Sequence, residues 1–171
     1  HESSLTRVRD VLLPSLIGPA LAPNGIPSMG ATNCDLNGDG RAEKRTVFYN
    51  KLTFPSGIEV GHGGVWVGSA PYLLFIPDKN KDDVPDSAPQ VILDGWGNQD
   101  LHETLNSFVW GPDGWLYGNQ GVFTFSNVGK PGARDKDRIP LNACIWRYHP
   151  TKKIFEVFAE GISNQWGLDF N

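Results

Sequence analysis

Short apolar runs separated by polar turns divide the chain from residue 34 onward. Each run holds four to six residues rich in Val, Ile, Leu, Phe, Tyr and Trp, and the turns contain Gly, Pro, Asn and Asp. Such runs are typical of β-strands, and no 3.6-residue periodicity indicates a helix in this region. The pattern predicts strands at 46–49, 57–60, 65–69, 72–76, 90–93, 107–111, 115–119, 143–148 and 154–158.

An internal repeat of about fifty residues relates these strands. GIEVGHGGVWVGS, residues 57–69, aligns without gaps with SFVWGPDGWLYGN, residues 107–119, and both segments read as strand, tight turn, strand. Gly64 and Gly114 fall where a tight hairpin favours positive φ, which glycine adopts at little steric cost. The two segments therefore predict equivalent β-hairpins in successive repeats.

A third copy of the repeat begins near the end of the chain. FAEGISNQWGL, residues 158–168, aligns with FYNKLTFPSGI, residues 48–58, so a strand is expected to open at Gly167. Four antiparallel strands in each fifty-residue unit are typical of a β-propeller blade, and a β-sandwich built of meanders is the alternative. Because a propeller closes with about 4–8 blades, we expect an all-β fragment of a larger propeller. This partial β-propeller would hold about two and a half four-stranded antiparallel blades, with blades at approximately 57–94 and 107–158.

Composition and charge narrow the function classes. The chain has 20 Gly, 13 Pro, 6 Trp and 9 Phe but one Met, which agrees with many turns and aromatic strands. The net charge is -4 without a basic stripe, so nucleic acid is not an expected partner. Prolines interrupt the only apolar stretch of the atypical segment 1–33, so no membrane span is expected, and 34–171 is assigned to the propeller. Cys34 and Cys144 form no CxxC pair and are either a disulfide or two separate core residues.

A first acidic loop, residues 35–43, has the spacing of the first part of an EF-hand calcium loop. Oxygen-bearing side chains alternate with other residues, and Gly40 at position 6 permits the sharp turn. Thr46 stands where a bidentate glutamate is usual, and a solvated acidic turn is the alternative. The expected calcium ligands are Asp35, Asn37, Asp39, Glu43 and, at position 7, Arg41.

A second acidic loop, residues 78–86, repeats this spacing before the next outer strand. Asp83 replaces the glycine of position 6, which makes the backbone conformation of the sharp turn less favourable. The expected calcium ligands are Asp78, Asn80, Asp82, Asp86 and, at position 7, Val84. Because both loops precede equivalent strands, a structural role is favoured over a catalytic one, and a solvated turn is again the alternative.

The loops at the opposite face carry the candidate chemistry. His102 is the candidate base, because neutral imidazole is poised near physiological pH, and a structural histidine capping a loop is the alternative. The long polar loop 122–142 either covers a site or is a solvated excursion. The residues expected to bind substrate or cofactor near His102 are Glu103, Asn119, Gln120, Ser163 and Asn164.

Three stretches of the chain resemble a known family. They are DLNGDGRAEKRTVFYNKLTFPSGIEVGHGGVWVGSAPYLLFIPD, LHETLNSFVWGPDGWLYGNQGVFTFSNVGKPG and ISNQWGLDFN, and the resemblance covers roughly residues 34–171. They resemble the membrane-bound dehydrogenase propellers of planctomycete-type bacteria, many of which carry a C-terminal CxxCH cytochrome c domain. More distantly, the chain is similar to the soluble pyrroloquinoline-quinone sugar dehydrogenases of the glucose/sorbosone type.

The resemblance implies roles for individual residues. In the wider family, a histidine shortly before a GPDG hairpin takes the proton from a sugar hydroxyl as hydride passes to the quinone, and His102 stands at that distance before GPDG here. The family's GDQG is matched by GNQG, with Asn119 in place of the acid. The family's RNPxGL is matched by SNQWGL, with Ser163 in place of the arginine that helps hold the quinone.

Two functions of different classes follow. The first is a sugar or alcohol oxidoreductase, quinone- or haem-linked, with structural calcium loops. Its cofactors would be calcium and pyrroloquinoline quinone, with haem only in a cytochrome c domain outside this chain. Its partners would be a small-molecule or carbohydrate substrate and that cytochrome domain. Its location would be extracytoplasmic, and the isolated fragment would be inactive. The alternative is a non-catalytic, calcium-stabilised propeller that binds carbohydrate or protein.

Overall fold

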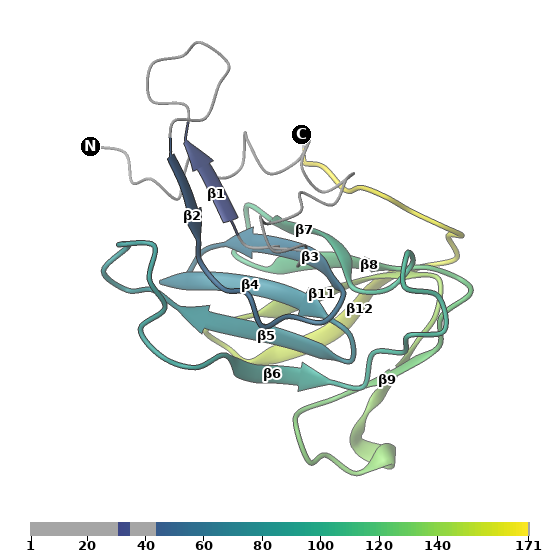
Figure 1. Ribbon diagram of the computed structural model, residues 1–171. Helices are drawn as coiled ribbons and strands as arrows, with labels where there is room; N and C mark the ends of the chain where they lie inside the picture. Colours follow the sequence, from purple (N-terminus) through teal and green to yellow (C-terminus); the bar gives the residue numbers. More distant parts are fainter. Residues whose placement is uncertain (1–30, 35–43, 171) are drawn as a thin grey trace.

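The computed structural model describes residues 31–34 and 44–170 and is all-β (Figure 1). Every strand pairing in the described part is antiparallel, no sheet there closes into a barrel, and the one short helix there is the 3-10 turn η3 (Asp135–Asp137). The strands are β1 (Ala31–Cys34), β2 (Lys44–Val47), β3 (Pro55–Val60), β4 (Gly64–Ser69), β5 (Tyr72–Pro77), β6 (Gln90–Asp94), β7 (Asn106–Trp110), β8 (Leu116–Gln120), β9 (Ser126–Val128), β10 (Ile139–Leu141), β11 (Cys144–His149) and β12 (Ile154–Glu160).

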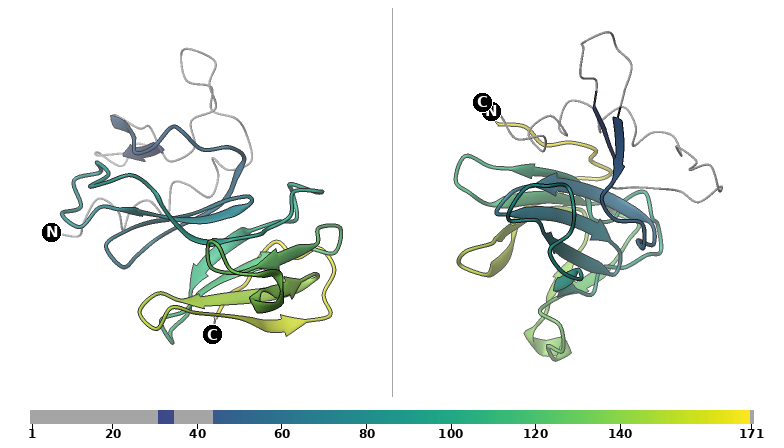
Figure 2. Two further views of the ribbon diagram at one scale, coloured as in Figure 1. Left: turned by 90° about the horizontal axis from the view of Figure 1, so that it is seen from below. Right: turned by 60° about the vertical axis from the view of Figure 1, so that its left-hand side comes forward.

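Two four-stranded sheets form the body of the molecule and lie as adjacent layers (Figure 2). The first has the order β3-β4-β5-β6, and the second has the order β7-β8-β11-β12. The edge strands β3 and β7 lie in contact, which brings the starts of the two repeats together. The eight strands expected for the two repeats are confirmed, with ends that differ by at most two residues.

The main hydrophobic core lies between the two sheets. Trp66 and Leu73 enter it from the first sheet, and Leu116 and Trp146 enter it from the second. The alternation of side chains along each strand explains which residues enter the core, because successive residues of a strand point to opposite faces of its sheet. In β11 the buried positions are Cys144, Trp146 and Tyr148, while the residues between them are partly exposed.

Strand β4 is buried along its whole length, because both faces of the first sheet are covered. Trp66 points into the core between the sheets. Its neighbours Val65 and Val67 point the other way, into a smaller cluster with Phe48 and Ile76. The segment that follows β2 therefore covers the outer face of the first sheet.

Strand β8 approaches β11 closely at one glycine. Gly118 is the register partner of Trp146, and a Cβ at Gly118 would collide with the Trp146 indole. The indole N–H donates to the carbonyl of Asn119 at 3.3 Å, which fixes the ring over this gap. A side chain larger than hydrogen at position 118 would displace the largest fully buried side chain of the core.

Three sequence-based expectations, on the first hairpin, the C-terminal segment and the cysteines, need correction. In the first hairpin the positive φ values fall on His62 (53°) and Gly63 (78°) and not on Gly64, whereas Gly114 does have φ 79°. No strand opens at Gly167, because residues 161–170 pair with no strand in the described part of the chain. The disulfide alternative is wrong, because Cys144 is a free, buried thiol whose pKa is raised to about 12 by burial.

The segment assigned as 1–33 ends in a strand that the sequence pattern did not indicate. Strand β1 pairs with β2, which accounts for the strand expected at 46–49, and residues 1–30 lie outside the described part. Within the long loop after β8, β9 and β10 pair into a small hairpin. Arg138 anchors this hairpin to the first sheet, since its Nη1 donates to the Asp94 carboxylate at 2.5 Å and to the Asn127 carbonyl at 3.2 Å. The base of the loop is therefore packed against the fold, whereas its tip, residues 130–137, is mostly exposed to solvent.

Candidate functional site

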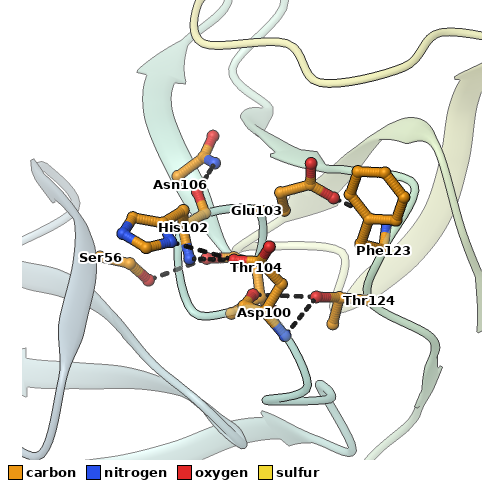
Figure 3. Close-up of polar contacts among 8 residues, drawn as sticks. All are labelled: Ser56, Asp100, His102, Glu103, Thr104, Asn106, Phe123 and Thr124. Carbon is orange, nitrogen blue, oxygen red and sulfur yellow. Dashed lines mark hydrogen bonds and ion pairs between the residues drawn. The ribbon is translucent and has the colours of Figure 1, made fainter.

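The loop between β6 and β7 presents His102 to solvent with its ring nitrogen paired to a carboxylate (Figure 3). The His102 side chain is 84% exposed, and its Nδ1 lies 3.1 Å from Oδ1 of Asp100. The same oxygen accepts the backbone N–H of His102 at 3.0 Å. Because a carboxylate only accepts, this contact requires the proton on Nδ1 and leaves the Nε2 lone pair facing solvent.

Thr124 holds Asp100 in place from a distant segment of the chain. Its hydroxyl donates to the carbonyl of Asp100 at 2.9 Å and accepts the backbone N–H of Asp100 at 3.2 Å. Sequence reasoning missed both residues. The Asp-x-His spacing was the available local signal for Asp100, whereas nothing local marks Thr124.

The rest of the loop is tied to both sheets. The hydroxyl of Ser56, on β3, donates to the carbonyl of Thr104 at 2.9 Å, and Nδ2 of Asn106 donates to the carbonyl of His102 at 3.1 Å (Figure 3). Leu105 and Ser107 have φ values of 55° and 56°, which are unfavourable for residues with a side chain. Strained backbone of this kind persists where surrounding contacts over-determine it, and it clusters at functional sites.

Glu103 follows His102 in sequence but turns inward. It is only 1% exposed, and its Oε2 accepts the backbone N–H of Phe123 at 2.7 Å. Its carbonyl accepts the N–H of Gly121 at 2.7 Å. The structure therefore places Glu103 beside the end of β8 and not on the solvent-facing side with the His102 ring.

Asn119 and Gln120 are both fully buried. Nε2 of Gln120 donates to the carbonyl of Thr124 at 2.8 Å, and its Oε1 accepts from the Ser126 hydroxyl at 3.2 Å. Neither amide atom of Asn119 has a hydrogen-bond partner among the described residues. The structure does not bring these two amides to the surface that carries His102.

Ser163 and Asn164 lie exposed in the segment that follows β12. Their neighbour Gln165 makes the contacts instead, because its Nε2 donates to the carbonyls of Gln120 at 2.7 Å and Cys144 at 2.8 Å. Sequence reasoning missed Gln165, although it lies within the SNQWGL match, because an uncharged amide carries no local mark of its partners.

Two aromatic side chains stand exposed beside this loop. Phe123 and Phe125 are 68% and 65% exposed, and they flank Thr124, which bonds Asp100. Large exposed aromatic groups on a monomer surface commonly mark a contact with a ligand or partner. They add an apolar rim to the surface that carries His102.

The second acidic loop is closed by its own hydrogen bonds. The two carboxylate oxygens of Asp78 accept the backbone N–H groups of Asp82 at 3.2 Å and Asp83 at 3.3 Å. Asp86 accepts the N–H of Lys79 at 2.7 Å, and Val84 donates its N–H to Asp82 at 2.9 Å. Asn80 reaches Asp82 as well, at 2.9 Å.

No group of three or more His, Cys, Asp or Glu side chains arranged to hold a metal ion occurs within residues 31–34 and 44–170. Asp83 takes the positive φ of 66° that position 6 of the acidic loop requires, so its backbone does follow the expected turn. The expected ligands of the first loop lie outside the described residues. They are Asp35, Asn37, Asp39, Arg41 and Glu43.

Arg147 is the centre of a cluster of ion pairs and hydrogen bonds on the outer face of the second sheet. The Arg147 guanidinium lies 4.2 Å from the centre of the Trp115 ring, and its Nε donates to Glu156 at 2.7 Å. Its Nη1 donates to the hydroxyl of Tyr117 at 3.0 Å, and that hydroxyl donates to Asp113 at 2.7 Å. Burial raises the pKa of Tyr117. The cluster fastens β8 to β11 and β12 and leaves no group for chemistry.

Within the described residues, no helix has the length and apolar character needed to cross a membrane.

Comparison with known proteins assigns the chain to a family. A search of curated proteins and a search of solved structures each returned no match. The family model described as "Domain of unknown function (DUF7133)" matches residues 32–171, which is well over half of the chain. The chain therefore belongs to the DUF7133 family.

Proposed function

We propose that the two sheets are neighbouring blades of a β-propeller. Three observations support this assignment: each sheet is a four-stranded antiparallel meander if the β9–β10 hairpin is left aside, the sheets pack through one shared core, and their first strands β3 and β7 are in contact. The fifty-residue repeat places equivalent strands at equivalent positions in the two sheets. On this assignment, His102 lies on a loop between blades.

On this fold we propose an oxidoreductase that acts on a sugar or alcohol hydroxyl, with His102 as the base. The observation that carries the proposal is the exposed His102 ring, whose Nδ1 is paired to Asp100 at 3.1 Å while Nε2 faces solvent. A substrate hydroxyl that hydrogen-bonds to Nε2 would give its proton to the ring as hydride leaves the carbon. Asp100 would stabilise the imidazolium that forms, as a carboxylate beside a histidine does in other bases.

The residues described here do not fit the quinone contacts that the resemblance implies. Asn119 is fully buried, and Ser163 carries no charge in place of the expected arginine. We therefore derive no step through pyrroloquinoline quinone. The proposal assigns hydride acceptance to a two-electron, quinone-type group held outside these residues, from which electrons would pass singly to a haem. The protein would be extracytoplasmic and of the planctomycete-type dehydrogenase kind.

The second candidate is a propeller that binds carbohydrate or protein without catalysis. The exposed rings of Phe123 and Phe125 favour it, because flat aromatic surfaces stack on the apolar faces of sugars and on peptide side chains. The burial of Asn119 and Gln120 favours it as well, since neither can reach a ligand above His102 without rearrangement.

We also propose that the second acidic loop binds calcium in a structural role. Its support is the backbone wound around Asp78, with the N–H groups of positions 5 and 6 on the carboxylate and a positive φ at position 6. Calcium would draw the carboxylates of Asp82 and Asp86 toward Asp78 and replace part of the present hydrogen bonding.

One assay separates the two functions. Dye reduction is measured with the full-length protein, quinone, calcium and a panel of sugars and alcohols, for the wild type and for His102→Ala. Turnover in the wild type that His102→Ala abolishes supports the oxidoreductase. Absence of turnover, together with carbohydrate binding that Phe123→Ala weakens and His102→Ala does not, replaces it with the binding function.

A further inference from the structure

Two buried amide side chains, one at the start of β7 and one near the end of β8, carry atoms without a hydrogen-bond partner. Asn119 is 0% exposed, and neither its Oδ1 nor its Nδ2 is bonded within the described residues. Asn106 is 3% exposed, and its Oδ1 is likewise unpartnered. The two residues are register partners on β7 and β8, so their side chains lie on the same face of the sheet. Buried polar atoms without a partner are unfavourable, so these atoms indicate a bound ligand.

A buried carboxylate lies on the same face. Oε2 and Cδ of Glu103 come within 2.6 and 2.7 Å of the position that a Cβ on Gly121 would occupy. Residues 119 and 121 are two apart, and in extended chain such residues point to the same face. The Glu103 carboxylate therefore occupies the side of the strand on which Asn119 lies.

This carboxylate has no cationic partner in the described part of the chain. Its hydrogen bond from the Phe123 N–H, at 2.7 Å, is a contact with a neutral group. Glu103 is only 1% exposed, and burying a carboxylate without a counter-charge is unfavourable. Figure 3 shows the Glu103 carboxylate directed to the backbone of Phe123 and the Asn106 amide directed to that of His102.

A fourth oxygen comes from the segment that follows β12. Gln165 uses its Nε2 for the Gln120 and Cys144 carbonyls, and its buried Oε1 is unpartnered. The same segment covers the Asn119 face of the sheet, because the Phe170 ring lies 5.1 Å from that of Tyr117, which is two residues from Asn119.

We propose that Glu103, Asn106, Asn119 and Gln165 form a buried binding site for a hard cation of the calcium type. The set offers one negative charge and several carboxylate and amide oxygens, which are the ligands that Ca²⁺ takes. One ion would satisfy the unpartnered amide oxygens and neutralise the buried carboxylate together. It would also brace the loop that carries His102, because Asn106 donates to the His102 carbonyl. The site shares no residue with the acidic loops and does not depend on His102 acting as a base.

The test is terbium luminescence sensitised by tryptophan, with calcium as competitor. Trp146 bonds the carbonyl of Asn119 at 3.3 Å from the core face of the sheet, so an indole lies across one sheet layer from the proposed ion. Asp39→Asn and Asp82→Asn are combined first, so that both acidic loops are weakened and the remaining signal reports this site. On that background, Glu103→Gln should lower calcium affinity about tenfold or more, and Asn119→Asp should raise it by a similar factor, because ligand charge count sets affinity.

The two variants are expected to change calcium affinity in opposite directions, so each one tests the site independently of the other. Glu103→Gln is nearly isosteric, and circular dichroism verifies that it folds. If it does not fold, tighter binding by Asn119→Asp still supports the site. The proposal is overturned if terbium binding disappears with Asp39→Asn and Asp82→Asn alone, or if neither variant changes calcium affinity, in which case ordered water fills the site. Neither readout uses enzymatic activity, so failure here is separate from failure of the oxidoreductase proposal.

Discussion

Trp110 donates its indole N–H to the carbonyl of Val60 at 2.8 Å, and the two residues are fifty positions apart. They are equivalent residues of successive repeats, so one hydrogen bond links the ends of β3 and β7. The indole also fills the space above Gly61, where a Cβ would collide with it, and its centre lies 4.6 Å from that of the His62 ring, with the planes tilted by 48°. This contact holds the two sheets together at the face away from His102.

Replacing Trp110 by Phe should separate the hydrogen bond from the packing. Trp110→Phe keeps an aromatic ring but leaves the Val60 carbonyl without its donor, so the free energy of unfolding should fall by about 1 kcal/mol. Urea denaturation followed by circular dichroism measures this value. Trp166→Phe is the matched control, because Trp166 is 61% exposed and should change stability little. Equal effects of the two substitutions would show that the inter-repeat bond contributes nothing.

Asp100 should act through His102 and not through substrate binding. In Asp100→Asn an oxygen remains for the Nδ1–H, but the charge that stabilises the imidazolium is lost. If the oxidoreductase proposal holds, kcat should fall about 10²-fold or more while KM changes little. Asp135→Asn, on the exposed turn η3, is the control and should keep full activity. A rise in KM with unchanged kcat would instead assign Asp100 to ligand binding.

His62 should make stability depend on pH. Burial, and secondarily the positive charge of His149, lower the pKa of His62 below 6.5 in the folded protein. The unfolded chain therefore takes up the proton first, so this contribution to stability is present above about pH 6.5 and is lost as pH falls through the folded-state pKa. Melting temperatures between pH 7.5 and 5 measure the slope.

Two variants isolate this effect. His62→Gln should flatten the slope, and His149→Gln should reduce it by a smaller amount, since burial is the larger cause. A slope that His62→Gln leaves intact would assign the pH dependence to other groups.

Calcium should stabilise the protein through the acidic loops. At about a hundred times its dissociation constant, a bound ion adds about 2.7 kcal/mol to the free energy of unfolding. The melting temperature should therefore rise on adding calcium and fall back with a chelator. Asp82→Asn should diminish the rise, because Asp82 stands at position 5 of the second loop. A melting temperature independent of calcium in the wild type would leave both loops as plain acidic turns.

Local patterns predicted the strands well because a strand's alternation and its turns are properties of neighbouring residues. Leu116 to Gln120 and Cys144 to His149 show this, since their expected ends shift by one residue only. The expected strand at Gly167 failed for a related reason. A strand exists only where a second strand accepts its hydrogen bonds, and the described part of the chain offers none at that place.

The candidate site was predictable only in part. His102 could be selected from its type and its position before the GPDG turn, and the structure places it exposed. The roles of Glu103 and Asn119 could not be read from the sequence, because burial depends on which distant segment covers a residue. Thr124 and Gln165 act through contacts 24 and 45 residues away in the chain, and no local pattern encodes those distances.

The sequence by itself determined an all-β chain, a fifty-residue repeat and the strands of two sheets, because period-two alternation and glycine-rich turns act over a few residues. The tertiary structure decided which polar groups face solvent and which are buried. It placed His102 outward beside Asp100, and it buried Glu103 and Asn119 within the fold. The physical reason is that a side chain's solvation and partners are set by the packing of segments far apart in the chain.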